Sequence, residues 1–566
     1  MKMTGGQALA RQLVIEGVTE VFGIPGVQLD FAMDALAELS GRVAFRNTRH
    51  EQAATYMADG FARSSGRVGV SLVVPGPGVL NALAALATAW SCSSPVLFLA
   101  GQVPSSGIGS GRGFLHEIPD QSGMLARLTK WSALAHSPAE VPKLAHEAFA
   151  ELRSGRPRPV ALELPPDVLA RDEPVSLVET AAQPNPLVPD EQDLDRATAL
   201  LARARRPAIF AGWGVQAAGA TGELRRLAEA LGAPVVMGQQ GRGSLDDRHP
   251  LALSSLGASE VLRRADVVLA VGTRFVEHDA GAIELPGTAS LVLLNADEEL
   301  LARSGRTALP ILGDALLGLR GIAEGVRPGR GHAWDPVEVE EIRRRCDQLI
   351  AEVEPQAGFV RALRDAIPED GILVNELTQV GYLARVAYPV FAPRTFLTPG
   401  HQGTLGYGFP TALGAKVAKP DRVVVSITGD GGFGWSMQEL ATARKHDIGV
   451  VTVIFNDDAY GNVRRIQVDR FGGRTIGSDL VNPDFVALGE AFGITATRAA
   501  TPAELGAVIA AHRGDHEPLL VEVPVGSMAT PWHLLDATTR KQRMAGTDVA
   551  CWTPAASSAT PAPEHG

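Results

Sequence analysis

Residues 426–461 read SITGDGGFGWSMQELATARKHDIGVVTVIFNDDAYG. The pattern predicts an apolar strand ending at Gly429-Asp430-Gly431, an amphipathic helix, and a second apolar strand ending at Asn456-Asp457. In a βαβ unit both strands end at one edge of a parallel sheet, so Asp430 and Asp457 can converge there. Carboxylate oxygens suit Mg²⁺, and the glycines let backbone N–H groups approach phosphate closely. The stretch predicts a site for a metal-bound diphosphate, although a Gly-Asp-Gly turn alone is more often an ordinary connection.

Gly429-Asp430-Gly431, the 24 residues of 432–455 and then Asn456-Asp457 resemble the signature of thiamine-diphosphate-dependent enzymes. The resemblance implies that Mg²⁺ is held by Asp430, Asp457 and the backbone carbonyl of Ala459. It also implies that the diphosphate is bound by Gly429, Asp430, Gly431, Gly432 and Asp457. The family usually has Asn where this chain has Asp457, so the site carries one more negative charge than its relatives.

A second segment, Arg49-His50-Glu51-Gln52, opens a predicted helix with Ala53, Ala54 and Met57 on its apolar face. The resemblance implies that Glu51 binds N1′ of the cofactor's aminopyrimidine and favours the imino tautomer that removes the thiazolium proton. Glu51 is therefore expected to be both catalytic and cofactor-binding. Taken alone, a Glu in a first helical turn can simply complement the helix dipole.

Further positions match loops that approach the cofactor in this family. The resemblance implies cofactor contacts from Pro77, Gln379, the Gly403 carbonyl and Leu405, whose side chain would hold the cofactor in its bent conformation. Val27 falls where the family lines the space above the thiazolium ring and is expected at the catalytic centre. As bare sequence, Pro77 belongs to a turn, Val27 to a core and Gln379 to a surface loop.

Composition is that of a large enzyme. The chain has 566 residues, is 45% hydrophobic and carries a net charge of −11, which argues against nucleic acid as a partner. No apolar run reads as a signal peptide or a membrane span, so the cytoplasm is the expected location and no membrane partner is expected. The three cysteines have no metal-site spacing and are expected to be reduced thiols.

Alternating apolar strands and helices predict an α/β protein with parallel sheets throughout. The resemblance implies three parallel-sheet α/β domains of the thiamine-diphosphate enzyme type. They are an N-terminal pyrimidine-binding domain (1–180), a central domain (190–330) and a C-terminal diphosphate-binding domain (350–530), followed by a tail (531–566). It also implies a homodimer or homotetramer in which Glu51 faces the diphosphate domain of another subunit.

Within the family, the segments 21–26 (VFGIPG), 49–52 (RHEQ) and 101–104 (GQVP) resemble the acetolactate synthase group. This implies a carboligase that decarboxylates a pyruvate-like 2-oxo acid and joins the resulting enamine to a second carbonyl acceptor. The alternatives are a 2-oxo acid decarboxylase or hydroxy-ketone lyase, and a catalytically silent cofactor-binding protein. His116 lies where relatives carry a Gln near the reacting groups, so it is expected to be catalytic, although a structural His is an equal alternative.

The central segment departs from the flavin-binding relatives. Gly212-Trp213-Gly214 places a bulky Trp in a run of glycines, residues 254–266 are shorter than their flavin-binding counterpart, and Val276-Glu277-His278 lacks the usual acidic-acidic-basic pattern. FAD is therefore not expected, and the central domain is expected to be mainly structural.

Overall fold

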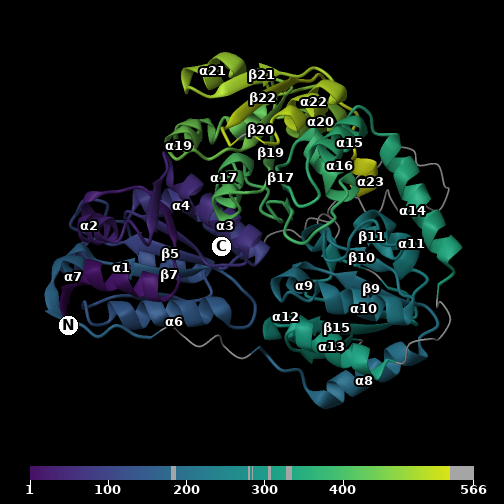
Figure 1. Ribbon diagram of the computed structural model, residues 1–566, viewed down its shortest axis with the longest axis horizontal. Helices are drawn as coiled ribbons and strands as arrows, with labels where there is room; N and C mark the ends of the chain where they lie inside the picture. Colours follow the sequence, from purple (N-terminus) through teal and green to yellow (C-terminus); the bar gives the residue numbers. More distant parts are fainter. Residues whose placement is uncertain are drawn as a thin grey trace, which may run out of the picture.

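The computed structural model describes residues 1–179, 186–277, 281–283, 285–303, 308–326, 334–514 and 516–535. Three six-stranded parallel sheets with helices packed on them form three domains, which are arranged as a triangle in Figure 1. This confirms the predicted α/β class with three parallel sheets. His278, Cys551 and the part of the expected tail from residue 536 onward lie outside the described residues. No helix among the described residues is both long and apolar enough to cross a membrane.

The N-terminal sheet has the strand order β3-β2-β4-β5-β7-β6. Its strands are β2 (Glu20–Gly23), β3 (Ala44–Asn47), β4 (Gly69–Val73), β5 (Val96–Gly101), β6 (Ser132–Leu134) and β7 (Val160–Leu164). The helices are α1 (Gly5–Ile15), α2 (Asp30–Glu38), α3 (Glu51–Ser65), α4 (Pro77–Cys92), α5 (Gln121–Leu128), α6 (Val141–Arg153) and α7 (Pro166–Ala170). A small antiparallel pair, β1 (Lys2–Thr4) and β8 (Asp172–Pro174), joins the two ends of this domain.

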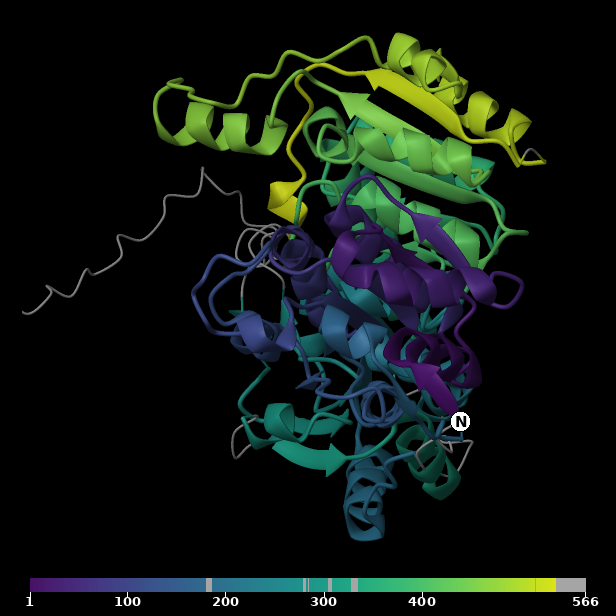
Figure 2. The same cartoon turned by 90° about the vertical axis from the view of Figure 1, so that its left-hand side faces the viewer.

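The C-terminal sheet repeats that topology in the order β18-β17-β19-β20-β22-β21. Its strands are β17 (Ile372–Asn375), β18 (Phe396–Leu397), β19 (Val424–Gly429), β20 (Val451–Asn456), β21 (Thr495–Arg498) and β22 (Leu519–Pro524). The longer helices are α15 (Gln356–Ala366), α16 (Gln379–Ala387), α17 (Gly408–Ala418), α20 (Gly461–Arg470), α21 (Phe485–Ala491) and α22 (Pro502–Ala511), and the short α23 (Trp532–Leu535) ends the described chain. Figure 2 shows this sheet at the top of the molecule, above the N-terminal domain.

The central sheet has the order β11-β10-β9-β12-β15-β16, the doubly wound arrangement of dinucleotide-binding folds. Its strands are β9 (Pro207–Ala211), β10 (Val235–Met237), β11 (Ala252–Ser254), β12 (Val267–Val271), β15 (Ser290–Asn295) and β16 (Ala308–Leu312), beside the short pair β13 (Val276–Glu277) and β14 (Gly281–Ala282). The helices are α8 (Glu191–Arg203), α9 (Trp213–Ala217), α10 (Thr221–Leu231), α11 (Ala258–Leu262), α12 (Glu298–Ala302) and α13 (Ala315–Gly325), and α14 (Pro336–Ala351) leads to the C-terminal domain.

The prediction of a single amphipathic helix between Asp430 and the next strand is wrong. The chain instead forms α18 (Asp430–Phe433), a 3₁₀ turn at Met437–Glu439 and α19 (Leu440–Lys445). Gly431, Gly432 and Gly434 explain the break, because glycine inside a helix costs about 1 kcal/mol relative to Ala. The two short helices leave the turn after β19 compact.

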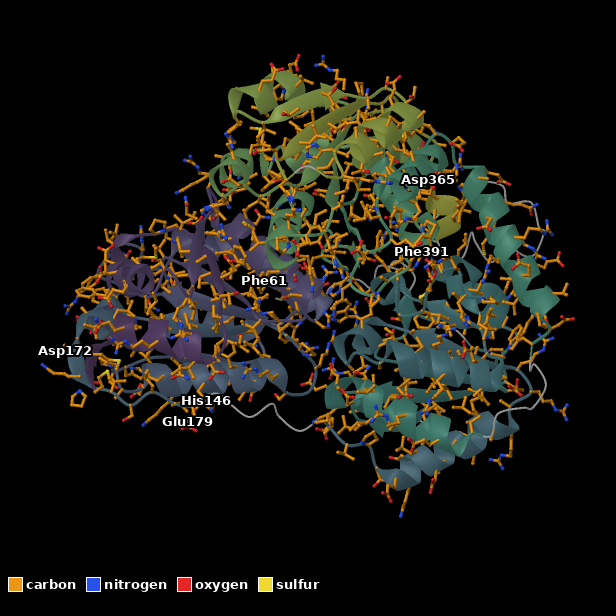
Figure 3. All side chains as sticks on the ribbon, in the orientation of Figure 1. Phe61, His146, Asp172, Glu179, Asp365 and Phe391 are labelled. Atoms are coloured by element: carbon orange, nitrogen blue, oxygen red, sulfur yellow. The ribbon has the colours of Figure 1, made fainter. Side chains whose placement is uncertain are left out.

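The N- and C-terminal domains meet where α3 crosses α17. A Cβ added at Gly60 would overlap the Thr411 carbonyl, and one added at Gly414 would overlap the Met57 carbonyl. The two helices therefore pack backbone against backbone, and Phe61 of α3 is buried nearby. Figure 3 shows Phe61 in the interior of the molecule and Asp172 at the outer rim of the N-terminal domain. This crossing brings the start of α3, which carries Glu51, beside the C-terminal domain.

Arg63 on α3 joins all three domains. Its guanidinium donates to the Tyr407 hydroxyl (2.8 Å) and the Thr398 carbonyl (2.9 Å) of the C-terminal domain, and to Gln240 Oε1 (2.9 Å) of the central domain. The side chain is 1% exposed and lies 3.4 Å from the equally buried Asp59 carboxylate. These contacts hold residues 398–407 of the C-terminal domain against the other two domains.

Candidate active site

Asp430 and Asp457 lie together at the carboxyl edge of the C-terminal sheet. Strands β19 and β20 are neighbours, with Gly429 opposite Phe455, so the residues that follow them meet, and the two carboxyl groups are close enough to influence each other's pKa. Burial raises the pKa of Asp430, and burial together with the charge of Asp430 raises the pKa of Asp457 to about 7. Ala459 follows two residues later and is buried. The predicted convergence of these residues is present.

Among the described residues, no cationic side chain neutralises this pair of carboxyl groups. Within the ranges that the structure describes, no Lys, Arg or His nitrogen forms an ion pair with Asp430 or Asp457 at a limit of 4.0 Å. The amide of Asn482 is the nearby donor, with Nδ2 at 2.7 Å from Asp430 Oδ2 and 3.0 Å from both Asn456 Oδ1 and Asp458 Oδ1. A hard cation would meet oxygen atoms here and no competing positive charge.

Glycines keep the turn around Asp430 narrow. A Cβ at Gly431 would strike the Tyr460 ring at 2.7 Å, and one at Gly432 would lie 2.6 Å from a Glu376 carboxylate oxygen. Gly429 ends β19 and has open space beside it, since the nearest atom to a Cβ built there would be Thr378 Cγ2 at 3.7 Å. The turn therefore fits glycine and presents backbone rather than side chains to a ligand.

Gln379 belongs to the same edge. A Cβ built on Gly461 would lie 3.2 Å from Gln379 Nε2 and would overlap a carboxylate oxygen of Asp457. Gln379 therefore lies beside the carboxylate pair, as expected for a residue near the diphosphate. Its helix, α16, begins at the carboxyl end of the neighbouring strand β17.

Hydrogen bonds to Glu376 hold the loop 403–408 in place. This carboxylate is buried and accepts hydrogen bonds from the Gly406 N–H (2.9 Å), the Gly408 N–H (3.1 Å) and the Thr428 hydroxyl (2.7 Å). Burial raises the pKa of Glu376. Sequence reasoning did not single out Glu376, although its place directly after the apolar strand β17 is a usable signal.

The N-terminal domain contacts the same loop from the other side. Gln52 Nε2 donates to the Leu405 carbonyl (3.3 Å), and the Leu405 side chain is 37% exposed. Gly403 and Gly406 have φ of 58° and 76°, which favours glycine at both positions. The loop therefore presents the Leu405 side chain from a rigid base, with the predicted Gly403 two residues before it.

Glu51 begins α3, with His50 as N-cap, and its Oε2 accepts from Asn81 Nδ2 (3.0 Å) on α4. Arg49, two residues before Glu51, contacts the C-terminal domain, because its backbone N–H donates to both carboxylate oxygens of Glu439 at 3.1 Å. Burial raises the pKa of Glu439 to about 7. In the described part of the chain, no hydrogen bond or ion pair links Glu51 with the Asp430–Asp457 pair.

The other N-terminal candidates gather around the turns after β2 and β4. Val27 is 63% exposed, and its neighbour Gln28 donates to the Leu115 carbonyl (3.2 Å) beside His116. The backbone of His116 has φ 69° and packs against Gly76, next to Pro77 at the start of α4. His116 Nδ1 is buried with no hydrogen-bond partner among the described residues. The structure thus brings Val27, Pro77 and His116 into one region.

The adjacent arginines on α20 do not form a free pair of cations. Arg464 lies 3.1 Å from the Asp479 carboxylate, and Arg465 lies 2.9 Å from Asp469. Their charges are therefore matched within the described structure, which favours a solvated helix face over a carboxylate-binding site.

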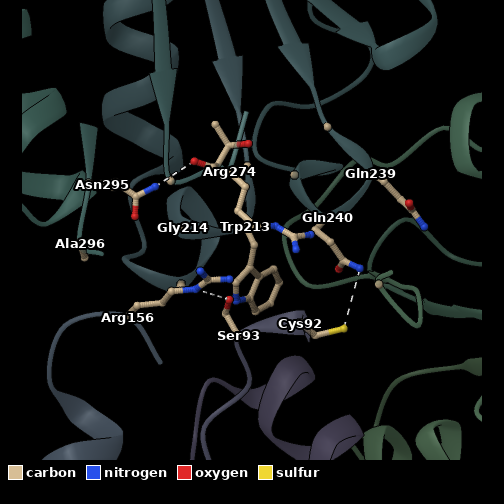
Figure 4. A pocket seen from close by; sticks show the side chains of 18 of the residues that line it. Cys92, Ser93, Arg156, Trp213, Gly214, Gln239, Gln240, Arg274, Asn295 and Ala296 are labelled. Carbon is tan, nitrogen blue, oxygen red and sulfur yellow. Dashed lines mark hydrogen bonds between the residues drawn. The ribbon is translucent and has the colours of Figure 1, made fainter. Parts of the chain in front are cut away.

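A cavity of about 640 Å³ lies at the carboxyl ends of β9 and β12, between the central and N-terminal domains. Figure 4 shows Trp213 standing in it, between Arg156 and Gln240. The Trp213 ring faces the Arg394 guanidinium at 5.0 Å and is 9% exposed. A nearly buried indole therefore lines the cavity at the edge of the sheet where a dinucleotide would bind.

Comparison with known proteins supports one family along the chain. The profile for the thiamine pyrophosphate enzyme N-terminal TPP binding domain matches residues 3–124, that for the central domain matches 194–322, and that for the C-terminal TPP binding domain matches 378–523.

Curated relatives agree. The chain is 38% identical over 508 residues to the probable 2-ketoarginine decarboxylase AruI of Pseudomonas aeruginosa (87% of this chain, 88% of the relative). It is 35% identical over 553 residues to the probable acetolactate synthase large subunit of Methanocaldococcus jannaschii (92% of each). It is 33% identical over 526 residues to the acetolactate synthase isozyme 3 large subunit of Escherichia coli (89% and 91%). These matches confirm the resemblance: the chain belongs to the thiamine pyrophosphate enzyme family and is an acetolactate synthase-like, thiamine-diphosphate-dependent enzyme.

Proposed function

We propose that this enzyme is a Mg²⁺-dependent carboligase that decarboxylates a 2-oxo acid and joins the remaining fragment to a second carbonyl compound. The observation that carries the proposal is the pair of acetolactate synthase relatives that span about nine-tenths of the chain. The site supports it with a hard-oxygen edge at Asp430 and Asp457 and a separate carboxylate, Glu51, on the other domain.

The residues present fit a metal-bound diphosphate. Asp430, Asp457 and the Ala459 carbonyl would hold Mg²⁺ through hard oxygens, and its octahedral shell would keep positions for diphosphate oxygens and water. The described residues contain no group of three or more His, Cys, Asp or Glu side chains that could hold a metal ion, so water or diphosphate oxygens would complete the shell. The narrow turn at Gly429, Gly431 and Gly432 would let backbone N–H groups reach that ligand.

When bound, thiamine diphosphate supplies the electron sink that allows a 2-oxo acid to lose CO₂. The protein's part is to orient the reactants and move protons. Glu51 would hold the proton at the aminopyrimidine, with Asn81 fixing its orientation through the bond to Oε2. Leu405 and Val27 would provide apolar walls on either side of the reacting centre, because both are exposed on loops held by buried contacts.

His116 would exchange a proton with the reacting groups. Its Nδ1 is buried without a partner among the described residues, which is costly unless a ligand or water completes the bond. The positive φ of His116 and the packing of its backbone on Gly76 hold the backbone that carries the ring. A substrate oxygen near Pro77 would meet this nitrogen.

A second candidate function is simple decarboxylation of a 2-oxo acid with release of the aldehyde. The relative that favours it is the probable 2-ketoarginine decarboxylase AruI, at 38% identity. Both functions share the cofactor chemistry and differ only in whether a carbonyl acceptor or a proton reaches the site after CO₂ leaves.

The proposal includes two further features. Assembly as a homodimer or homotetramer would let Glu51 of one subunit serve the diphosphate edge of another. The central domain would hold no FAD, because Trp213 stands in the cavity at the switch point of the sheet.

The test is product analysis by mass spectrometry. Purified protein with thiamine diphosphate and Mg²⁺ would be given pyruvate or 2-ketoarginine, with and without an aldehyde acceptor, beside the Glu51→Gln variant. A coupled hydroxy ketone or hydroxy acid that is lost in the variant would support the carboligase. Free aldehyde alone would establish the decarboxylase instead, and no CO₂ from either acid would overturn both.

A further inference from the structure

The carboxylate pair at the diphosphate edge carries more negative charge than any described protein group balances. Asp430 is 2% exposed, its carboxyl group lies beside that of Asp457, and neither forms an ion pair with a cationic side chain in the described residues. Asp458 adds a third carboxylate, linked to Asp430 through the Asn482 amide. The neighbouring Asp479 is already paired with Arg464 at 3.1 Å. The uncompensated charge is therefore local to residues 430 and 457–458.

A divalent cation matches this charge without help from a cofactor. Two carboxylates neutralise a doubly charged ion, whereas the Asp and Asn of the family pattern leave one positive charge for the diphosphate to balance. Even at the dielectric constant of water, a unit charge about 4 Å from a divalent ion changes affinity on the order of thirtyfold. Asp457 should therefore decide whether the cation binds before the diphosphate arrives.

We infer that this chain binds its divalent cation first, in the absence of thiamine diphosphate, and that Asp457 makes this order possible. The inference rests on the proposed function for the identity of the diphosphate. The carbonyl of Ala459 would complete the protein's share of the shell, and it is preformed because Ala459 is bridged to Asp479 in the backbone.

The same charge has the opposite effect on the cofactor. Without metal, the buried Asp430 and the half-buried Asp457 repel a diphosphate at this edge, so the cation has to be present before thiamine diphosphate can bind. Replacing Asp457 by Asn removes one of these repulsions. The substitution should therefore weaken binding of the metal alone and strengthen binding of the cofactor alone, two effects of opposite sign at one position.

The first experiment titrates Mn²⁺ into protein stripped of metal and cofactor and follows free Mn²⁺ by electron paramagnetic resonance. We expect wild type to bind one Mn²⁺ per chain, and Asp457→Asn to bind it at least tenfold more weakly. The control, Asp458→Asn, makes the same charge change one residue away, at a side chain that faces the Asn482 amide. It should weaken Mn²⁺ binding less than Asp457→Asn does, because the attraction of a charge falls with distance and the exposed Asp458 carboxylate is screened by solvent.

The second experiment measures binding of thiamine diphosphate by calorimetry in the presence of a chelator. Wild type should show no binding, and Asp457→Asn should bind. The inference is overturned if wild type binds no Mn²⁺ until thiamine diphosphate is added, or if Asp457→Asn and Asp458→Asn weaken Mn²⁺ equally. The wild-type titration decides the order even if a variant fails to fold. Neither readout uses turnover, so failure here leaves the carboligase proposal standing, and failure of the product assay leaves the binding order standing.

Discussion

Replacing Glu439 by Gln should make the protein's stability respond differently to pH. Glu439 is fully buried and accepts the Arg49 N–H at 3.1 Å and a hydrogen bond from the Thr442 hydroxyl. Gln has nearly the same shape and a carbonyl oxygen that can still accept from Arg49. The substitution therefore removes the titration while leaving the packing and the bond to the start of α3 in place.

The magnitude comes from the raised pKa. Burial raises the pKa of Glu439 from an ordinary 4.5 to about 7, so between these values the folded chain keeps a proton that the unfolded chain releases. This contribution to stability is complete below pH 4.5 and is lost as the pH rises through 7. From pH 5 to pH 8 the loss amounts to about 2.5 kcal/mol in wild type and is absent in Glu439→Gln.

The assay is thermal unfolding of wild type and variant at pH 5, 6, 7 and 8, followed by circular dichroism. For a unit of 150–250 residues, 2.5 kcal/mol corresponds to roughly 5–10 °C in the unfolding temperature. The unfolding temperature of the variant minus that of wild type should therefore be larger at pH 8 than at pH 5 by this amount. Glu38→Gln, an exposed site at the end of α2, is the control and should track wild type. A difference between Glu439→Gln and wild type that stays constant across this range would refute the reasoning.

Three further predictions concern the domain crossing, the subunits and the cavity. Gly60→Ala should lower the free energy of unfolding in urea by about 1–3 kcal/mol, because the added Cβ overlaps the Thr411 carbonyl. Gly222→Ala, in open space on α10, should change that free energy by less than about 1 kcal/mol. An equal loss in both variants would contradict the packing argument. Mixing Glu51→Gln with Asp430→Asn subunits should restore about one quarter of wild-type activity, whereas no recovery would place each site within one chain. Denatured protein should release no flavin by fluorescence, and a stoichiometric amount would reverse the interpretation of the central domain.

The sequence predicted the parts of the site that follow from strand ends. Asp430 and Asp457 meet because the apolar runs before them form neighbouring parallel strands, and the connection between them is short enough to allow little else. Gln379 follows the same rule at the end of β17. Residues of this kind are readable because one local pattern determines their position.

The supporting residues could not be read in this way. Glu376 reaches Thr428, 52 positions away, and Glu439 reaches Arg49, 390 positions away. Each contact depends on how separate segments pack, and a buried Glu has the same sequence pattern as an exposed one. The broken helix after Asp430 was missed for a related reason, because the apolar periodicity continues through glycines that interrupt the backbone.

The crossing of α3 and α17 also has a consequence for synthesis on the ribosome. Gly60 is made about 350 residues before Gly414, its partner helix's glycine. At 5–20 residues per second, the docking face of α3 waits roughly 20 to 70 seconds for α17 to emerge. Besides Gly60, that face carries Tyr56, Met57 and Phe61, which belong to the same core cluster as residues of α17, so it leaves apolar area uncovered while it waits. The crossing that joins the two domains thus leaves an apolar helix face uncovered for much of the time that the chain takes to be made.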